Sequence, residues 1–198
     1  MRRRGSFLVW LVLLGVMGAL PVTPASAAGV RWGNTLRNGD GSVKQPQNAP
    51  RVCDSGGPLA GQPCTMVSVL TSNTGHEKAP KDGTIKRVRV VAAHAGSFRL
   101  FFAKAKPGAK QARIVKRGPV ISFAGDDTAP YTIETKAVSI SVKKGWYLAA
   151  RASSFETVTC FSGSPAQLEF QPPLAVGAPF ATADDTNGCY LLVQLEYA

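Results

Sequence analysis

The chain has 198 residues, with 23 Lys and Arg against 12 Asp and Glu and a formal net charge of +11. This length suits one domain whose core is large enough to fold without a structural metal. After residue 27 no apolar stretch approaches the ~20 residues of a membrane-spanning helix, so we expect no membrane anchor in the mature chain.

The first 27 residues have the pattern of a secretory signal peptide. Arginines at positions 2–4 precede an apolar run from Phe7 to Leu20, and Ala25-Ser26-Ala27 matches a small-residue cleavage site. The apolar run is too short for a spanning helix. We therefore expect cleavage after Ala27, which leaves a mature chain of 171 residues with a formal charge of +8. The protein is predicted to be secreted or associated with the cell envelope.

Residues 28–62 differ in composition from the rest of the chain. They are rich in Gly, Asn, Pro and Gln and show no hydrophobic period, which favours an irregular, partly mobile leader. Within this stretch, the run from Asn38 to Ser42 lacks the distal Glu of a calcium loop and predicts a turn. The domain itself is expected to comprise residues 63–198.

The four cysteines predict disulfides, because an even number in an exported chain favours pairing. Of the three possible pairings we favour Cys53–Cys64, which would enclose ten residues dense in turn formers, and Cys160–Cys189, near the last strand. Each would contribute about 2–4 kcal/mol. A zinc site is not expected, because the chain has no CxxC and neither histidine lies at ligand spacing from a cysteine.

Two short motifs are similar to parts of trypsin-like serine proteases. The run from Asp54 to Leu59 resembles the segment around that family's nucleophile, which would be Ser55, and Ala92-Ala93-His94 resembles its histidine segment. We reject the assignment because His94 follows Ser55, the reverse of the family's order, and the mature chain is too short for two barrels. A cysteine-closed turn and a hairpin loop are expected instead.

From residue 65 onward, short apolar-alternating runs separated by turn residues predict a series of short β-strands. The clearest pair, 84–91 and 97–104, predicts a β-hairpin in which Val88 and Val90 point inward while Arg87 and Arg89 point outward. In its second strand Phe98, Leu100 and Phe102 share one face, and Arg99 and Phe101 share the other. The other predicted strands are 65–71, 112–116, 120–123, 131–135, 137–142, 146–152, 156–161, 167–170 and 189–197. No helical period appears after residue 27, so the pattern predicts an all-β fold, a single antiparallel β-sandwich.

Several turns and strands between residues 79 and 197 carry a resemblance. They are Pro80, Asp82, Gly83 and Ile85, SFRLFF at 97–102, VSISVKKG at 138–145, Pro172-Pro173-Leu174 with Gly177, and residues 188–196. This run resembles a group of uncharacterised secreted β-sandwich domains of Gram-positive bacteria. The resemblance implies a jelly-roll-like domain behind a signal peptide, with a cysteine just before the first strand, as Cys64 is here. That group commonly has Gly-Asp where this chain has Gly145-Trp146, and it supplies no activity.

Cations are concentrated between residues 78 and 117, which hold 12 of the 20 basic residues of the mature chain and one acid, Asp82. Such a concentration attracts polyanions, because each contact with a phosphate or sulfate releases counterions. We expect binding to an anionic cell-envelope or extracellular polymer, or else a merely solvated face. The candidate ligand-binding residues are Lys86, Arg87, Arg89 and Arg99, expected on neighbouring strands, and Lys104, Lys106 and Lys110 in the adjoining loop. No motif for sequence-specific nucleic-acid recognition is present.

Two further functions stay open, a carbohydrate-binding module and a structural domain without a dedicated ligand. A sugar platform needs exposed rings, for which the candidates are Trp146, Tyr147, Tyr131 and Phe155. Trp146 shares the inward phase of Leu148, which favours a core position. Asp126-Asp127 and Asp184-Asp185 are candidates for calcium in such a module, although Asp is also common in turns.

Enzymatic activity is not expected, and neither is a catalytic residue, a metal or a cofactor. The chain has two histidines, both in predicted loops, and no glycine-rich loop that would cradle a phosphate. Glycosidases can be built on a sandwich, but they need two positioned carboxylates, and nothing in the sequence nominates such a pair.

Overall fold

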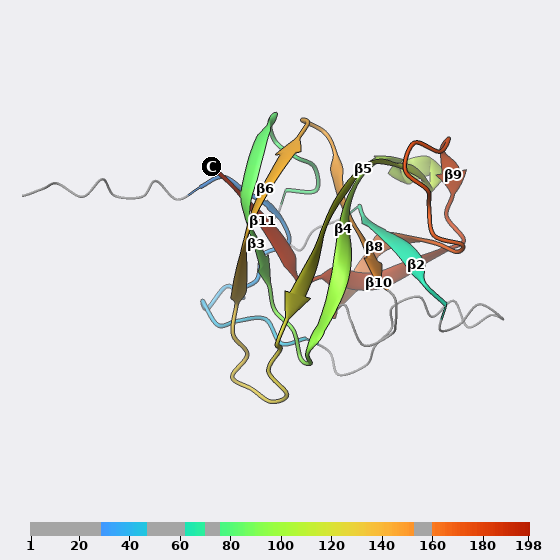
Figure 1. Ribbon diagram of the computed structural model, residues 1–198. Coiled ribbons are helices and arrows are strands. Elements are labelled where there is room, and N and C mark those ends of the chain that lie inside the picture. Colours follow the sequence, from blue (N-terminus) through green and yellow to red (C-terminus); the bar gives the residue numbers. More distant parts are fainter. Residues whose placement is uncertain (1–28, 47–61, 70–75, 153–159) are drawn as a thin grey trace, which may run out of the picture.

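The computed structural model describes residues 29–46, 62–69, 76–152 and 160–198, whose strands form two antiparallel sheets (Figure 1). The all-β prediction is confirmed: in the described part the one helical element is a single 3-10 turn, η1 (Pro107–Ala109). No helix within these ranges is long and apolar enough to cross a membrane.

One sheet has four strands and the other has seven. In spatial order the four-stranded sheet contains β1 (Arg31–Gly33), β11 (Val193–Tyr197), β3 (Gly83–Val90) and β6 (Glu134–Val142). The seven-stranded sheet contains β10 (Asp185–Leu191), β8 (Cys160–Phe170), β2 (Cys64–Ser68), β7 (Tyr147–Ala152), β4 (Gly96–Lys106), β5 (Gln111–Phe123) and β9 (Ala181–Thr182).

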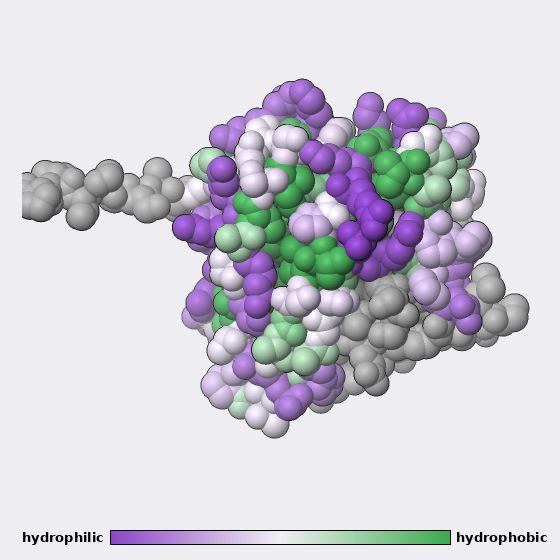
Figure 2. Space-filling model, in the orientation of Figure 1, coloured by the Kyte–Doolittle hydropathy of each residue, from purple (hydrophilic) through white to green (hydrophobic). Residues whose placement is uncertain are grey.

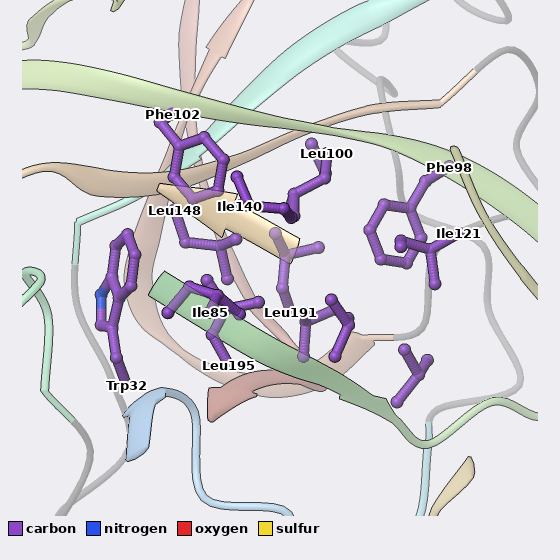
Figure 3. Packing of buried hydrophobic residues seen from close by; sticks show 14 of the residues in the cluster. Trp32, Ile85, Phe98, Leu100, Phe102, Ile121, Ile140, Leu148, Leu191 and Leu195 are labelled. Atoms are coloured by element: carbon purple, nitrogen blue, oxygen red, sulfur yellow. The ribbon is translucent and has the colours of Figure 1, made fainter. Parts of the chain in front are cut away.

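The main hydrophobic core lies between the two sheets (Figure 3). Phe98, Leu100 and Phe102 point into it from β4, and Val88 and Val90 from β3, as the alternation predicted. The other large side chains in this core include Trp32, Ile85, Ile121, Ile140, Leu148, Leu191 and Leu195.

A second core covers the opposite face of the seven-stranded sheet. Phe101 and Ala103, which alternate with the inward residues of β4, are buried there with Ile114. Leu174, from the segment after β8, packs on the same cluster. Both faces of β4 are therefore apolar, which explains why Phe101 follows Leu100 in the sequence without facing solvent.

The predicted hairpin of 84–91 and 97–104 is wrong, because β3 and β4 belong to different sheets. Residues 91–95 carry the chain across the sandwich, and the N–H of Val91 donates to the carbonyl of Leu192, 3.1 Å away. At Leu192 the chain also changes sheets, from β10 to β11, which splits the predicted strand 189–197. Val91, Leu192 and Leu36 form one small buried cluster that fastens both crossings.

Other strand boundaries differ from the prediction in smaller ways. The runs 112–116 and 120–123 are one strand, β5, which carries irregularities where it passes Leu100 and Phe102 of β4. Strand β6 begins at Glu134, so most of the predicted strand 131–135 lies outside it. Of the predicted strand 156–161, residues 156–159 lie outside the described residues, and β8 runs without a break from Cys160 to Phe170.

The segment expected to be an irregular leader contributes to the sandwich. Residues 31–33 form β1, which pairs with β11, and Trp32 is fully buried with its ring centroid 5.8 Å from that of Phe102. The predicted turn within this segment is confirmed, because the carboxylate of Asp40 accepts hydrogen bonds from the N–H and hydroxyl of Ser42. Residues 47–61, and with them the Asp54 to Leu59 motif, lie outside the described residues.

Three of the four cysteines in the predicted disulfides lie among the described residues. Cys64 is buried at the start of β2 and is not a free thiol, but its expected partner Cys53 lies outside the described residues. Cys160 and Cys189 lie on neighbouring strands, Cys160 opposite Leu191 and Cys189 opposite Ser162. The two pairings stay predictions.

Lys116, on β5, links the two sheets. Its ammonium group donates to the carbonyl and the hydroxyl of Ser141 on β6, each 2.7 Å away. In the view of Figure 2, hydrophilic residues cross β5 beside an apolar patch that lies between β5 and β6. Val115 and Val138 are the partly buried apolar residues of these two strands that pack on the main core.

Gly125 is a position where the fold requires glycine. Its φ is +70°, and a Cβ there would collide with the backbone carbonyl of His94. We expect Gly125→Ala to lower the free energy of unfolding by at least about 2 kcal/mol, measured by chemical denaturation. Gly41→Ala is the matched control, because Gly41 also has a positive φ but open space around it; it should cost about 1 kcal/mol. Equal losses in the two variants would contradict the assigned contact with His94.

Candidate anion-binding surfaces

The seven predicted ligand residues lie in three separate places. Lys86, Arg87 and Arg89 lie on β3, on the face of the four-stranded sheet that points away from the core. Arg99 lies on β4 in the other sheet, so its predicted position beside β3 is wrong. The remaining three, Lys104, Lys106 and Lys110, lie at the turn between β4 and β5. The structure therefore does not gather them into one site.

The outer face of the four-stranded sheet carries a set of arginines, which we term the arginine face: Arg31, Arg37, Arg87 and Arg89. Arg87 lies opposite Glu196 of β11, and Glu196 lies opposite Arg31 of β1, so the three side chains share one face. On the β11 side, β3 has one extra residue between Ile85 and Arg87. This irregularity leaves both Lys86 and Arg87 exposed.

A single carboxylate is paired with the arginine face in the described part of the chain. Glu196 Oε1 lies 2.9 Å from Arg87 Nη1, and its Oε2 lies 3.9 Å from Arg31 Nε. The Glu196 side chain is only 12% exposed, whereas those of Arg31 and Arg87 are 48% and 56% exposed. The cations thus project beyond the acid that partly neutralises them.

Arg89 is held by an amide instead of a carboxylate. Its Nη1 donates to Gln194 Oε1 at 2.7 Å, and Gln194 Nε2 donates to the carbonyl of Asn34 at 3.1 Å. Burial lowers the pKa of Arg89, and repulsion from Arg31, Arg37 and Arg87 adds to this effect while Glu196 opposes it. The other three guanidinium groups are thus close enough to repel that of Arg89, and an incoming anion would offset this repulsion.

Arg31 and Arg37 were not among the predicted ligand-binding residues, because they lie in the segment that was expected to be an irregular leader. The one local signal was the alternation of Val30 and Trp32 with Arg31, which is too short a pattern to predict a strand. Arg37 lies just beyond β1, where its Nη1 donates to the carbonyl of Gly41 at 2.6 Å.

The cations at the β4–β5 turn are partly engaged in contacts of their own. The Lys106 ammonium lies 4.5 Å from the ring centroid of Phe180, and the Arg113 guanidinium lies 5.0 Å from the same centroid. Lys110 has a positive φ of 50° and follows η1 in the turn. Cation–π contacts of this kind fix the segment around Phe180 against the sheet.

Most of the aromatic candidates for a sugar platform are withdrawn from solvent. Tyr147 is 3% exposed and Trp146 is partly buried, with its ring centroid 6.1 Å from that of Phe102. Tyr131 packs on the small cluster at the sheet crossing. Phe155 lies outside the described residues.

The candidate calcium and protease residues have local roles where they are described. Asp126 accepts hydrogen bonds from Thr132, and Asp184 from the N–H of Gln171. Across the described ranges, no group of three or more His, Cys, Asp or Glu is arranged to hold a metal. His94 Nδ1 lies 3.0 Å from Asp127 Oδ1 on the surface, and Ser55 lies outside the described residues.

Comparison with known proteins adds no relative: no protein family, no curated protein and no solved structure matches this chain. The resemblance to secreted β-sandwich domains of Gram-positive bacteria therefore stays an expectation from the residues that carry it.

Proposed function

We propose that this protein is an exported, non-catalytic β-sandwich module that binds an anionic polymer of the cell envelope or extracellular space. The arginine face would form the contact surface, with Lys86 beside it. The observation that carries the proposal is the gathering of four arginines on one face, where Glu196, the one carboxylate paired with them among the described residues, contacts only Arg31 and Arg87.

A sheet face suits an extended polymer better than a compact ligand. The arginines come from β1, from the segment after it and from β3, so their charge extends over three neighbouring strands, β1, β11 and β3. Arginine presents a planar fork of donors that matches phosphate and sulfate oxygens. The signal-peptide pattern supports export, because it would deliver such a surface to the compartment where these polymers occur.

Retention on immobilised polymers tests this function. The protein expressed from its full sequence is passed over heparin, over long-chain polyphosphate and over neutral dextran. We expect retention on the two anionic polymers that persists to about 0.3 M salt and is lost at higher salt, since counterion release drives the binding. Retention on dextran, or none on any of the three, would refute the proposal; the first result would favour a carbohydrate-binding module.

A further inference from the structure

Three arginines lie together on the other side of the molecule, and we term them the arginine row: Arg99, Arg117 and Arg151. They come from the neighbouring strands β4, β5 and β7. Arg99 lies directly opposite Arg151, and Arg117 lies opposite Phe101. Phe101 belongs to the second core, so the row lies on the face of the seven-stranded sheet that points away from the four-stranded sheet.

The arginine row has no acidic partner among the described residues. None of the five ion pairs there includes any of the three arginines. Burial lowers the pKa of Arg151, and repulsion from Arg117 and then Arg99 lowers it further. Like charges directly opposite each other on paired strands destabilise a sheet. The pair of Arg99 and Arg151 therefore carries a cost that no described carboxylate offsets.

Arg151, on β7 at one end of this row, is held by two contacts. Its guanidinium lies over the ring of Phe101, 4.8 Å from the centroid, and its Nη2 donates to the carbonyl of Leu174. Leu174 is anchored in turn, because its N–H donates to the hydroxyl of Thr65 at 3.1 Å. The Nε of Arg151 is buried and has no hydrogen-bond acceptor within the described ranges. An unmet buried donor is costly, and it leaves the charge of this guanidinium uncompensated; an anion at the row would offset that charge.

We propose that the arginine row is a binding site for a phosphate or sulfate group. A tetrahedral oxyanion offers several acceptor oxygens and takes up donors from more than one guanidinium, so one group can neutralise the repulsion among all three. Because Arg151 is already fixed by Phe101 and Leu174, little conformational freedom is lost on binding. The site lies on the opposite sheet from the arginine face and does not depend on the proposed function.

The Nε–H signals of the arginines test this site directly. Inorganic phosphate or sulfate is added to the full-length protein at constant ionic strength, with chloride as the reference, while arginine side-chain resonances are recorded by NMR. We expect a saturable shift of the Arg151 Nε–H signal. Arg117→Gln should weaken the affinity about tenfold, because one charge-assisted donor is lost, while Lys144→Gln should leave it unchanged.

Two features keep this test decisive. Arg117 is exposed, so its substitution leaves the core intact, whereas Arg151 packs on Phe101 and its loss could disturb the fold. No saturable shift, or equal affinity in Arg117→Gln and the unsubstituted protein, would overturn the proposal. A parallel titration with short polyphosphate shows whether free anion or a chain is the better source. If the protein is not retained on the anionic polymers but still shows the saturable NMR shift that depends on Arg117, the proposed function is refuted and the anion site at the arginine row stands.

Discussion

Replacing Trp32 with alanine is expected to lower the free energy of unfolding by about 3–5 kcal/mol. Trp32 is fully buried between the sheets and packs on Phe102, so its loss would leave a large cavity in the main core (Figure 3). For a chain of this size the melting temperature should fall by roughly 10 °C. Chemical denaturation followed by circular dichroism measures both the free energy and its dependence on denaturant.

Val30→Ala is the matched control for Trp32. Val30 precedes β1 and is 41% exposed, so its truncation should change the stability by less than about 0.5 kcal/mol. A loss below about 1 kcal/mol in Trp32→Ala would contradict the docking of β1. It would restore the interpretation of residues 28–62 as a leader outside the domain.

Changing Arg87 and Arg89 together to glutamine is expected to weaken binding to heparin about 10- to 30-fold at 0.15 M salt. Each cation that contacts the polymer releases about 0.7–0.9 counterions, so two lost contacts give a loss of this size. Glutamine retains hydrogen-bonding groups toward Glu196 and Gln194, which limits damage to the sheet. Isothermal titration calorimetry with a heparin oligosaccharide measures the change.

The control for this double variant removes the same charge elsewhere. Lys143 and Lys144 lie between β6 and β7, where Lys143 pairs with Asp82 at 3.2 Å. Changing both to glutamine should leave the affinity within about threefold of the unsubstituted protein. Equal weakening by the two double variants would mean that net charge, and not the arginine face, governs binding.

The direction in which each strand faces was predictable, but the partner of each strand was not. Alternation is a local property, so Val88 and Val90 of β3 and Phe98 and Phe102 of β4 were assigned to the core correctly. Pairing depends on contacts between residues far apart in the sequence. A connection of five residues can form a hairpin loop within one sheet or carry the chain from one sheet to the other. The buried contact between Val91 and Leu192 favours the connection between the sheets.

For the basic residues too, the sequence showed where they cluster along the chain but not which of them lie together in the fold. The cation-rich stretch of residues 78–117 was visible in the sequence, yet the sandwich distributes it over both sheets. Arg31 and Arg151 were missed because each reaches its cluster through register with a distant strand, β11 for Arg31 and β4 for Arg151. Only the pairing of strands brings these residues beside the predicted ones.

The salt dependence of heparin binding by Glu196→Gln tests the central claim most directly, because this change should strengthen binding. Glu196 is the carboxylate paired with the arginine face, so its neutralisation frees Arg87 and Arg31 for the polymer. We expect an affinity about 3- to 5-fold higher at 0.15 M salt, and a plot of log affinity against log salt that is steeper by about one unit. Unchanged or weaker binding by a variant that melts cooperatively would contradict polymer binding at the arginine face.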